Sequence, residues 1–227
     1  MSAVERELRV RLTAAGLPDL LATPLAFYGA ALLAANARVN LTGAKSVDAL
    51  LPHLLDSLTV APYIDDPLVD IGSGGGLPAI PLAIATGIHV TMIETTVKKA
   101  RFLEETLNAM GLAGRVVAER AEVAAHLPEL RERFAAGTAR AVSSAPTVAE
   151  LLLPFLAVGG MAVLQRGALD DPERHAVTDA APMLGAQFDR EIELDGDRRI
   201  LLIRKTAETP ARFPRRNGIP EKRPLCL

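Results

Sequence analysis

The residues with the clearest chemical potential lie between Asp70 and Gly76, in the segment DIGSGGG. An apolar run ends at Asp70, and four glycines follow before a second apolar run begins. Glycines at this spacing let the backbone come very close to the polar atoms of a ligand. Because ligands of open α/β sheets bind where strands end and helices begin, we predict the main binding site at this turn.

Three classes of ligand compete for the turn. A P-loop needs a Lys-Ser/Thr pair to meet phosphates and magnesium, but Leu77 and Pro78 stand there, which excludes nucleotide hydrolysis. The segment GGGLPA from Gly74 to Ala79 fits the dinucleotide pattern formally, yet Pro78 and Pro81 remove N–H groups that would face a pyrophosphate. The third class is S-adenosylmethionine, which has no phosphate. Asp70 is placed to offset its cationic methionyl part.

Two later segments would complete a nucleoside site. Glu94 ends the next apolar run, where a carboxylate can accept hydrogen bonds from both ribose hydroxyls. The segment ERAEV places Arg120, Ala121 and Glu122 at the end of the third run, where their backbone groups can meet an adenine edge. S-adenosylmethionine and a dinucleotide would both use Glu94.

The elements that position these residues follow from periodicity. Residues 5 to about 55 carry apolar side chains at helical intervals. After them, short apolar runs alternate with amphipathic segments, which predicts an α/β fold with an open, mainly parallel sheet covered on both faces. The last two runs flank an Asp-Gly turn at Asp195 and Gly196, which predicts a terminal antiparallel hairpin.

The composition limits the kinds of protein that the chain can be. The chain has 227 residues, 49% of them hydrophobic, which is ample for a core. Its beginning lacks the pattern of an export signal, and its longest apolar runs are interrupted by proline or glycine, so we expect a cytoplasmic protein with no membrane partner. A single cysteine and four scattered histidines indicate neither an internal disulfide nor a metal site.

Charge is unevenly distributed along the chain. The net charge is −2, but residues 204–227 hold seven basic residues against two acidic ones. This tail also carries four prolines, so we expect it to run extended with its cations pointing outward. An extended cationic tail suits a polyanion such as RNA.

With these residues placed, the sequence resembles the bacterial small-subunit ribosomal RNA guanine-N7 methyltransferase G family, also called glucose-inhibited division protein B. The resemblance covers nearly the whole chain. It rests on NLTG at 40–43, HLLDSL at 53–58, VDIGSGGGLPAIPLAI at 69–84, KKARFL at 98–103, RAE at 120–122, ARAV at 139–142 and the tail TPARFPRRNGIPEKRPL.

The resemblance implies a class I, Rossmann-like methyltransferase fold with an N-terminal helical extension. It also implies methyl transfer from S-adenosylmethionine to N7 of one guanosine in the 530 loop of 16S rRNA. The expected parts are a helical extension at 1–55, a methyltransferase domain at 56–205 and a basic tail at 206–227. We expect a monomer that acts on 16S rRNA or the small ribosomal subunit and contains no metal.

The expected site residues follow from the chemistry of the residues together with the family resemblance. The expected cofactor-binding residues are Asp70, Gly72, Ser73, Gly74, Gly76, Leu77, Glu94, Thr95, Thr96, Ala121, Glu122 and Arg140. The expected RNA-binding residues are Lys98, Lys99, Arg101, Arg166, Arg212, Arg215, Arg216, Lys222 and Arg223. Arg140 is also the one candidate catalytic residue, since its guanidinium fork could reach either the methionyl carboxylate or the target nucleotide.

Methylation of N7 agrees with the absence from the sequence of the motifs that other nucleobase methylations need. N7 of guanine has a free lone pair and no proton, so its methylation needs no general base. Methylation of an amino group would favour an Asn/Asp-Pro-Pro-aromatic segment where RAVSSAPT stands, and carbon-5 methylation would need a nucleophilic cysteine, whereas Cys226 is the penultimate residue. The alternatives left open are a methyltransferase for a small molecule or protein, a nicotinamide-dependent oxidoreductase and a non-catalytic RNA-binding scaffold.

Overall fold

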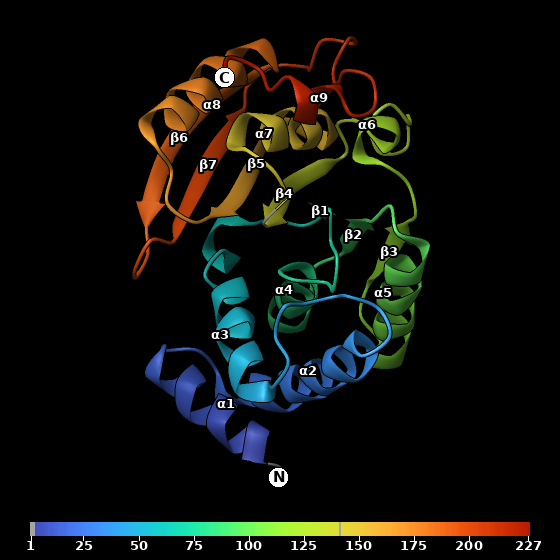
Figure 1. Ribbon diagram of the computed structural model, residues 1–227, viewed down its shortest axis with the longest axis vertical. Coiled ribbons are helices and arrows are strands. Elements are labelled where there is room, and N and C mark those ends of the chain that lie inside the picture. The colour runs from blue at the N-terminus through green and yellow to red at the C-terminus, as the bar shows by residue number, and fades with distance from the viewer. Residues whose placement is uncertain (1–2, 141) are drawn as a thin grey trace.

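A computed structural model describes residues 3–140 and 142–227. In these ranges, seven strands form one sheet in the order β3-β2-β1-β4-β5-β7-β6 (Figure 1). The strands are β1 (Leu68–Ile71), β2 (Val90–Ile93), β3 (Gly114–Val117), β4 (Phe134–Arg140), β5 (Leu156–Arg166), β6 (Ala186–Glu193) and β7 (Arg199–Lys205). The first five strands are parallel, and β7 is antiparallel to both β5 and β6, which confirms the predicted mainly parallel sheet with a terminal hairpin.

Helices cover both faces of this sheet. They are α1 (Ala3–Ala14), α2 (Ala22–Asn36), α3 (Val47–Leu58), α4 (Ala79–Thr86), α5 (Val97–Met110), α6 (Ala121–Ala124), α7 (Ala145–Leu152), α8 (Asp171–Met183) and α9 (Ile219–Lys222). Short 3-10 helices occupy Asp19–Leu21, Ala61–Tyr63 and Leu153–Phe155.

Alternating side chains of the strands divide the core into two layers. Leu68, Met92 and Leu202 belong to the apolar cluster formed with α1 to α5. Val69 and Ile71 belong to the opposite cluster, formed with α6, α7 and α8. This alternation is the period-two pattern of strands that are buried on both faces.

The strand order reverses direction at β1. This strand lies between β2 on one side and β4 on the other, and both neighbours are parallel to it. The chain segments that leave β1 and β4 therefore turn to opposite faces, which opens a crevice at the carboxyl ends of these strands. The glycine turn follows β1 and Arg140 ends β4, so both predicted features lie at this crevice.

The N-terminal helices pack on the sheet instead of forming a separate body. Leu25, Leu32 and Leu54 lie in the same apolar cluster as the strands. The predicted boundary after residue 55 falls inside α3, which ends at Leu58. The division of the chain into three parts stays a prediction.

One helical stretch, Asp19–Asn36, has the length and apolar composition of a membrane span. The sequence had led us to expect an interrupted run too short for a bilayer, because Pro24 stands inside it. Pro24 instead lies in the first turn of α2, where proline costs a helix little. Leu25 and Tyr28 of this stretch are fully buried in the protein core, which is also typical of a core helix.

The C-terminal segment, residues 206–227, corrects a second expectation. It does not point all its cations outward, because Phe213 and Leu225 insert into the core cluster beside α7 and α8 and Arg215 turns inward. It also contains the short helix α9. In Figure 1 the segment runs across the top of the molecule, over α6 and α7.

Candidate functional site

The glycine turn leaves no room for a side chain at Gly76. A Cβ atom added at Gly76, where φ is +97°, would lie 2.6 Å from the side chain of Ile80 and 3.2 Å from the hydroxyl of Tyr28. That hydroxyl donates a hydrogen bond of 2.7 Å to the carbonyl of Gly75, and burial raises the pKa of Tyr28. Helix α2 therefore holds the turn from behind, while the turn's other side faces the crevice.

Asp70 is the unusual charge of this turn. Its side chain is 1% exposed, and neither carboxylate oxygen has a hydrogen-bond partner. Burial raises the pKa of Asp70 to about 8, against the weaker opposing influences of the Ser73 side chain and then the Arg140 guanidinium. A buried acceptor without a partner costs free energy unless a ligand completes it, and a cationic group such as an ammonium would do so.

Glu94 ties the turn to the end of β2. One carboxylate oxygen accepts a hydrogen bond of 2.9 Å from the backbone N–H of Gly74, and the other accepts one of 2.7 Å from the N–H of Thr96. The side chain is 6% exposed. Each oxygen keeps a further lone pair, so Glu94 can still accept hydrogen bonds from a diol at this edge.

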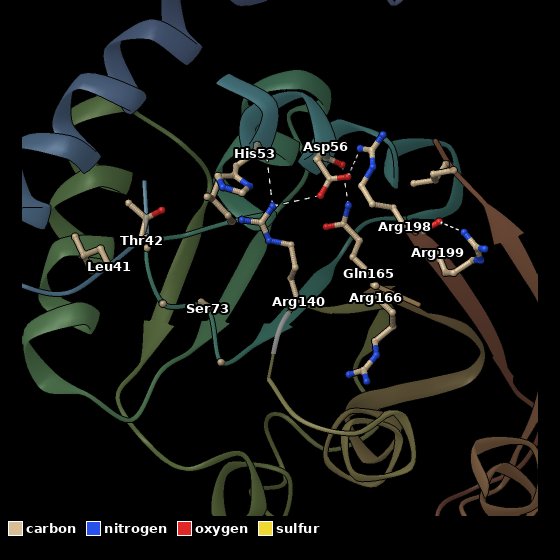
Figure 2. Close-up of a pocket in the computed structure, with 17 residues that line it drawn as sticks. Leu41, Thr42, His53, Asp56, Ser73, Arg140, Gln165, Arg166, Arg198 and Arg199 are labelled. Atoms are coloured by element: carbon tan, nitrogen blue, oxygen red, sulfur yellow. Dashed lines mark hydrogen bonds and ion pairs between the residues drawn. The ribbon is translucent and has the colours of Figure 1, made fainter. Parts of the chain in front are cut away.

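A large cavity of about 660 Å³ opens beside the turn, between α3 and the ends of β4, β5 and β7 (Figure 2). Its lining residues are Leu41, Thr42, Gly43, His53, Asp56, Gly72, Ser73, Gly74, Gly75, Leu77, Arg140, Gln165, Arg166, Gly167, Leu194, Arg198 and Arg199. The cavity has four arginines, whose guanidiniums pair with the carboxylates of Asp56, Glu173, Glu191 and Glu193. We refer to it as the arginine cavity.

Asp56 organises one wall of the arginine cavity. Its carboxylate lies 2.7 Å from Arg198 and 3.5 Å from Arg140. Gln165 donates a 2.7 Å hydrogen bond to the backbone carbonyl of the same aspartate, so β4, β5, the hairpin turn before β7 and α3 meet there. Figure 2 shows these side chains converging on Asp56, with His53 on the other side of Arg140. Burial, together with Arg140, lowers the pKa of His53, which favours its neutral form.

A second, smaller cavity of about 200 Å³ lies at the ends of β1, β2 and β3. Its lining residues are Ile71, Gly72, Ile93, Glu94, Thr95, Glu119, Arg120, Ala121, Glu122, Val142, Ser143, Thr147, Leu151 and Glu221. We refer to it as the side cavity. Gly72 lines both cavities, so they meet at the glycine turn.

The structure brings the predicted cofactor-binding residues together. Gly72, Ser73, Gly74, Leu77 and Arg140 line the arginine cavity, and Gly72, Glu94, Thr95, Ala121 and Glu122 line the side cavity. The remaining three, Asp70, Gly76 and Thr96, line neither cavity but contact or adjoin residues that do. Their roles toward a cofactor stay predictions.

The predicted RNA-binding residues are more scattered. Arg166 lines the arginine cavity, but its guanidinium pairs with Glu173 at 2.6 Å and donates to the carbonyl of Ser143. Arg215 is paired with buried Glu150 at 2.6 Å, so the expectation that it points outward is wrong. The other seven lie outside both cavities, with Lys98, Lys99 and Arg101 on α5 and Arg212, Arg216, Lys222 and Arg223 in the C-terminal segment.

Sequence reasoning assigned no role to several residues that the fold places in the arginine cavity. Asp56 belongs to the HLLDSL motif, and Arg198 follows the Asp-Gly turn of the terminal hairpin. The sequence offered one signal for this contact, namely an acidic residue in HLLDSL and a basic residue after the Asp-Gly turn. The two residues lie 142 positions apart, and only the topology brings them together. Among the described residues, no cluster of His, Cys, Asp and Glu is placed to hold a metal ion.

The fold and the site define a class of protein. Three features are typical of class I S-adenosylmethionine-dependent methyltransferases: a glycine turn after β1, an acidic residue after β2, and a strand order that reverses at β1, between β2 and β4. This chain has all three. The model of one family within this class, rRNA small subunit methyltransferase G, matches residues 22–200. The chain belongs to that family.

Relatives support this assignment across most of the chain. The ribosomal RNA small subunit methyltransferase G of Rubrobacter xylanophilus is 39% identical over 213 residues, which cover 86% of this chain and 81% of the relative. The protein of the same name from Dehalococcoides mccartyi is 40% identical over 201 residues, which cover 84% of this chain and 86% of the relative.

Solved structures share the fold at low sequence identity. A geranyl diphosphate methyltransferase in complex with GPP and sinefungin has a TM-score of 0.56 at 16% identity, covering 69% of this chain and 78% of that one. Mitomycin 7-O-methyltransferase has a TM-score of 0.54 at 17% identity, covering 69% of this chain and 55% of that one. These similarities concern the fold alone.

Proposed function

We propose that this protein transfers a methyl group from S-adenosylmethionine to N7 of one guanosine in the 530 loop of 16S rRNA. The observation that carries the proposal is the pair of cavities that meet at the glycine turn. One is narrow and has carboxylates for a nucleoside, and the other is wide and has arginines for an anionic acceptor.

The residues present fit the cofactor. Buried Asp70 lacks a hydrogen-bond partner, and the methionyl ammonium is a cation that would complete it. A Cβ atom at Gly72, where φ is +65°, would lie 2.8 Å from Val142, so the backbone alone forms the floor between the two cavities. S-adenosylmethionine supplies a methyl group that is activated as part of a sulfonium ion. In this proposal Glu94 binds the ribose, and Ala121 with Glu122 faces the adenine.

Arg140 is the residue at which cofactor and acceptor meet. It ends β4, and its side chain is 19% exposed. Its guanidinium makes two long polar contacts, one of 3.5 Å to the carboxylate of Asp56 and one of 3.4 Å to the backbone carbonyl of His53. Contacts of this length leave donors available for a carboxylate or a phosphate. We assign Arg140 to orienting charged groups, since methylation of N7 needs no proton transfer.

The arginine cavity provides the acceptor site. Its volume of about 660 Å³ is within the range of small-molecule pockets, so it can accept one nucleotide that has left its stack. N7 lies on the Hoogsteen edge, which the deep groove of an A-form helix hides. An unpaired loop nucleotide is therefore the fitting substrate, and Arg198, whose side chain is 44% exposed, is available for its phosphate.

The acceptor in the cell follows from the family. The relatives are named for the small-subunit ribosomal RNA, so we assign 16S rRNA or the small ribosomal subunit as the partner and the cytoplasm as the place of reaction. A monomer suffices, because the described residues of one chain line both cavities.

Transfer of label from S-adenosylmethionine to purified small subunits tests the proposal. The subunits should come from a strain that lacks this gene, so that the target is unmodified. We expect label in 16S rRNA and none in small subunits that already carry the modification. Cofactor binding without any transfer would favour a non-catalytic scaffold, and transfer to protein or to a small molecule instead would replace the acceptor.

A further inference from the structure

The C-terminal segment is fixed to the protein by a buried charge. Glu150 in α7 is 0% exposed, and its carboxylate accepts hydrogen bonds from the backbone N–H of Arg215 at 2.8 Å and from its guanidinium at 2.6 Å. A buried carboxylate with one cationic partner is costly to expose or to leave unpaired. Residues around Arg215 are therefore held firmly against α7.

Beyond this anchor, the segment reaches the side cavity. The backbone N–H of Gly218 donates a 2.9 Å hydrogen bond to the carboxylate of Glu122, a residue expected to face the adenine. The carbonyl of Pro220 accepts a 3.0 Å hydrogen bond from the hydroxyl of Thr147. Glu122 and Thr147 both line the side cavity, so these two bonds lie at its wall.

Glu221 completes that wall. It is the residue of the C-terminal segment that lines the side cavity, which otherwise belongs to the sheet edge, α6 and α7. Its side chain is exposed, and no hydrogen bond or ion pair is recorded for it among the described residues. A carboxylate in this place is an acceptor for an amino group that donates two hydrogen atoms, such as the exocyclic amine of adenine.

We infer that the C-terminal segment is part of the adenosine site and that Glu221 is a cofactor-binding residue. The inference rests on the proposed function, since it takes the side cavity as the site of the adenosine. It differs from the expectation for the tail, which was contact with RNA phosphates.

Binding and docking of the segment are then linked. A ligand that binds only the docked form stabilises it, so the cofactor should protect the segment from local opening. Conversely, any change that loosens the segment should lower the affinity for the cofactor more than the affinity for RNA. The contact between Gly218 and Glu122 is the direct route, because it joins the segment to α6 at the side cavity.

Calorimetry with S-adenosylhomocysteine tests the role of Glu221 in the full chain without RNA. We expect Glu221→Ala to raise the dissociation constant about fivefold, as for loss of one hydrogen bond of ordinary strength at an exposed position. Glu208→Ala is the matched control, because it removes the same charge from an exposed position of the same segment outside both cavities. Equal dissociation constants for the two variants would overturn the role of Glu221.

Hydrogen exchange of the unaltered protein provides a test that needs no variant. We expect S-adenosylhomocysteine to slow exchange across residues 212–223, above all at the amide of Gly218. Unchanged exchange in a protein that binds the ligand would overturn the linkage and leave the proposed function intact. Absence of any binding to the unaltered protein would instead contradict the proposed function itself.

Discussion

The carboxylate of Glu94 bridges two backbone N–H groups, that of Gly74 at 2.9 Å and that of Thr96 at 2.7 Å. It thereby joins the glycine turn after β1 to the residue that precedes α5. Because the strands are parallel, the two loops lie at the same edge of the sheet, and one carboxylate serves both. The turn is therefore held in shape before any ligand arrives.

Replacing Glu94 by glutamine should damage this arrangement. The amide presents one oxygen, so either Gly74 or Thr96 would face an NH₂ group instead of an acceptor. We expect the dissociation constant of S-adenosylhomocysteine to rise at least about tenfold, since hydrogen bonds to charged groups contribute about 1.5–3 kcal/mol. Calorimetry measures this change. Glu104→Gln, at an exposed position on α5, serves as the control and should bind normally.

Asp70 should make stability depend on pH in an unusual direction. Burial raises its pKa from 3.8 to about 8, while the Ser73 side chain and Arg140 oppose this rise and Glu94 adds to it. The folded chain thus keeps a proton that the unfolded chain releases. The resulting stabilisation is complete below pH 4 and is lost as the pH rises to about 8, at a slope of at most about 1.4 kcal/mol per pH unit.

Urea unfolding between pH 5 and 8 measures this contribution as a difference between the unaltered protein and Asp70→Asn. The asparagine variant has nearly the same shape and cannot titrate, so its stability should fall less steeply with pH. Identical slopes for the two proteins would show that Asp70 is already ionised when folded, and would remove the argument that it awaits a cation.

Arg198 should matter for RNA and not for the cofactor. Its guanidinium lies 2.7 Å from Asp56 at the rim of the arginine cavity and outside the side cavity. We expect Arg198→Ala to weaken binding of small subunits and to lower the salt dependence of that binding by about one phosphate contact. Arg6→Ala, an exposed cation on α1, should change neither. A loss of cofactor affinity in Arg198→Ala would contradict this assignment.

Arg215 should be a stabilising residue of the fold. Replacing it by alanine leaves Glu150 buried without its cation, which costs about 3–5 kcal/mol. Urea unfolding measures the loss. Adding Glu150→Gln to the same variant should recover part of it, because the amide tolerates burial better than an unpaired carboxylate. If the double variant is no more stable than Arg215→Ala, the buried charge is not the cause.

Local patterns in the sequence were sufficient for the sheet and the turn. Short apolar runs and the Asp-Gly hairpin report interactions within one element or between neighbours, so they predicted the mainly parallel sheet and its terminal hairpin. They failed for the C-terminal segment, whose charge and prolines indicated an outward arm. The position of this segment depends on the contact of Arg215 with Glu150, a residue 65 positions away that is buried by the packing of α7.

The arginine cavity shows the same limit. Asp56 and Arg198 lie 142 residues apart, and their pairing exists only because α3 and the terminal hairpin meet over the end of β5. No spacing rule in the sequence expresses such a contact. The HLLDSL segment entered the sequence analysis only as part of the family resemblance, and the structure places its aspartate in the arginine cavity.

The central claim is most directly tested by mapping N7-methylguanosine in 16S rRNA from three strains. One carries the gene, one lacks it, and one expresses Gly74→Asp, which places a carboxylate in the arginine cavity at a residue whose N–H donates to Glu94. Strand cleavage specific for N7-methylguanosine should appear at one guanosine of the 530 loop in the first strain only. Cleavage that persists without the gene, or that is restored by the Gly74→Asp variant, would contradict the account.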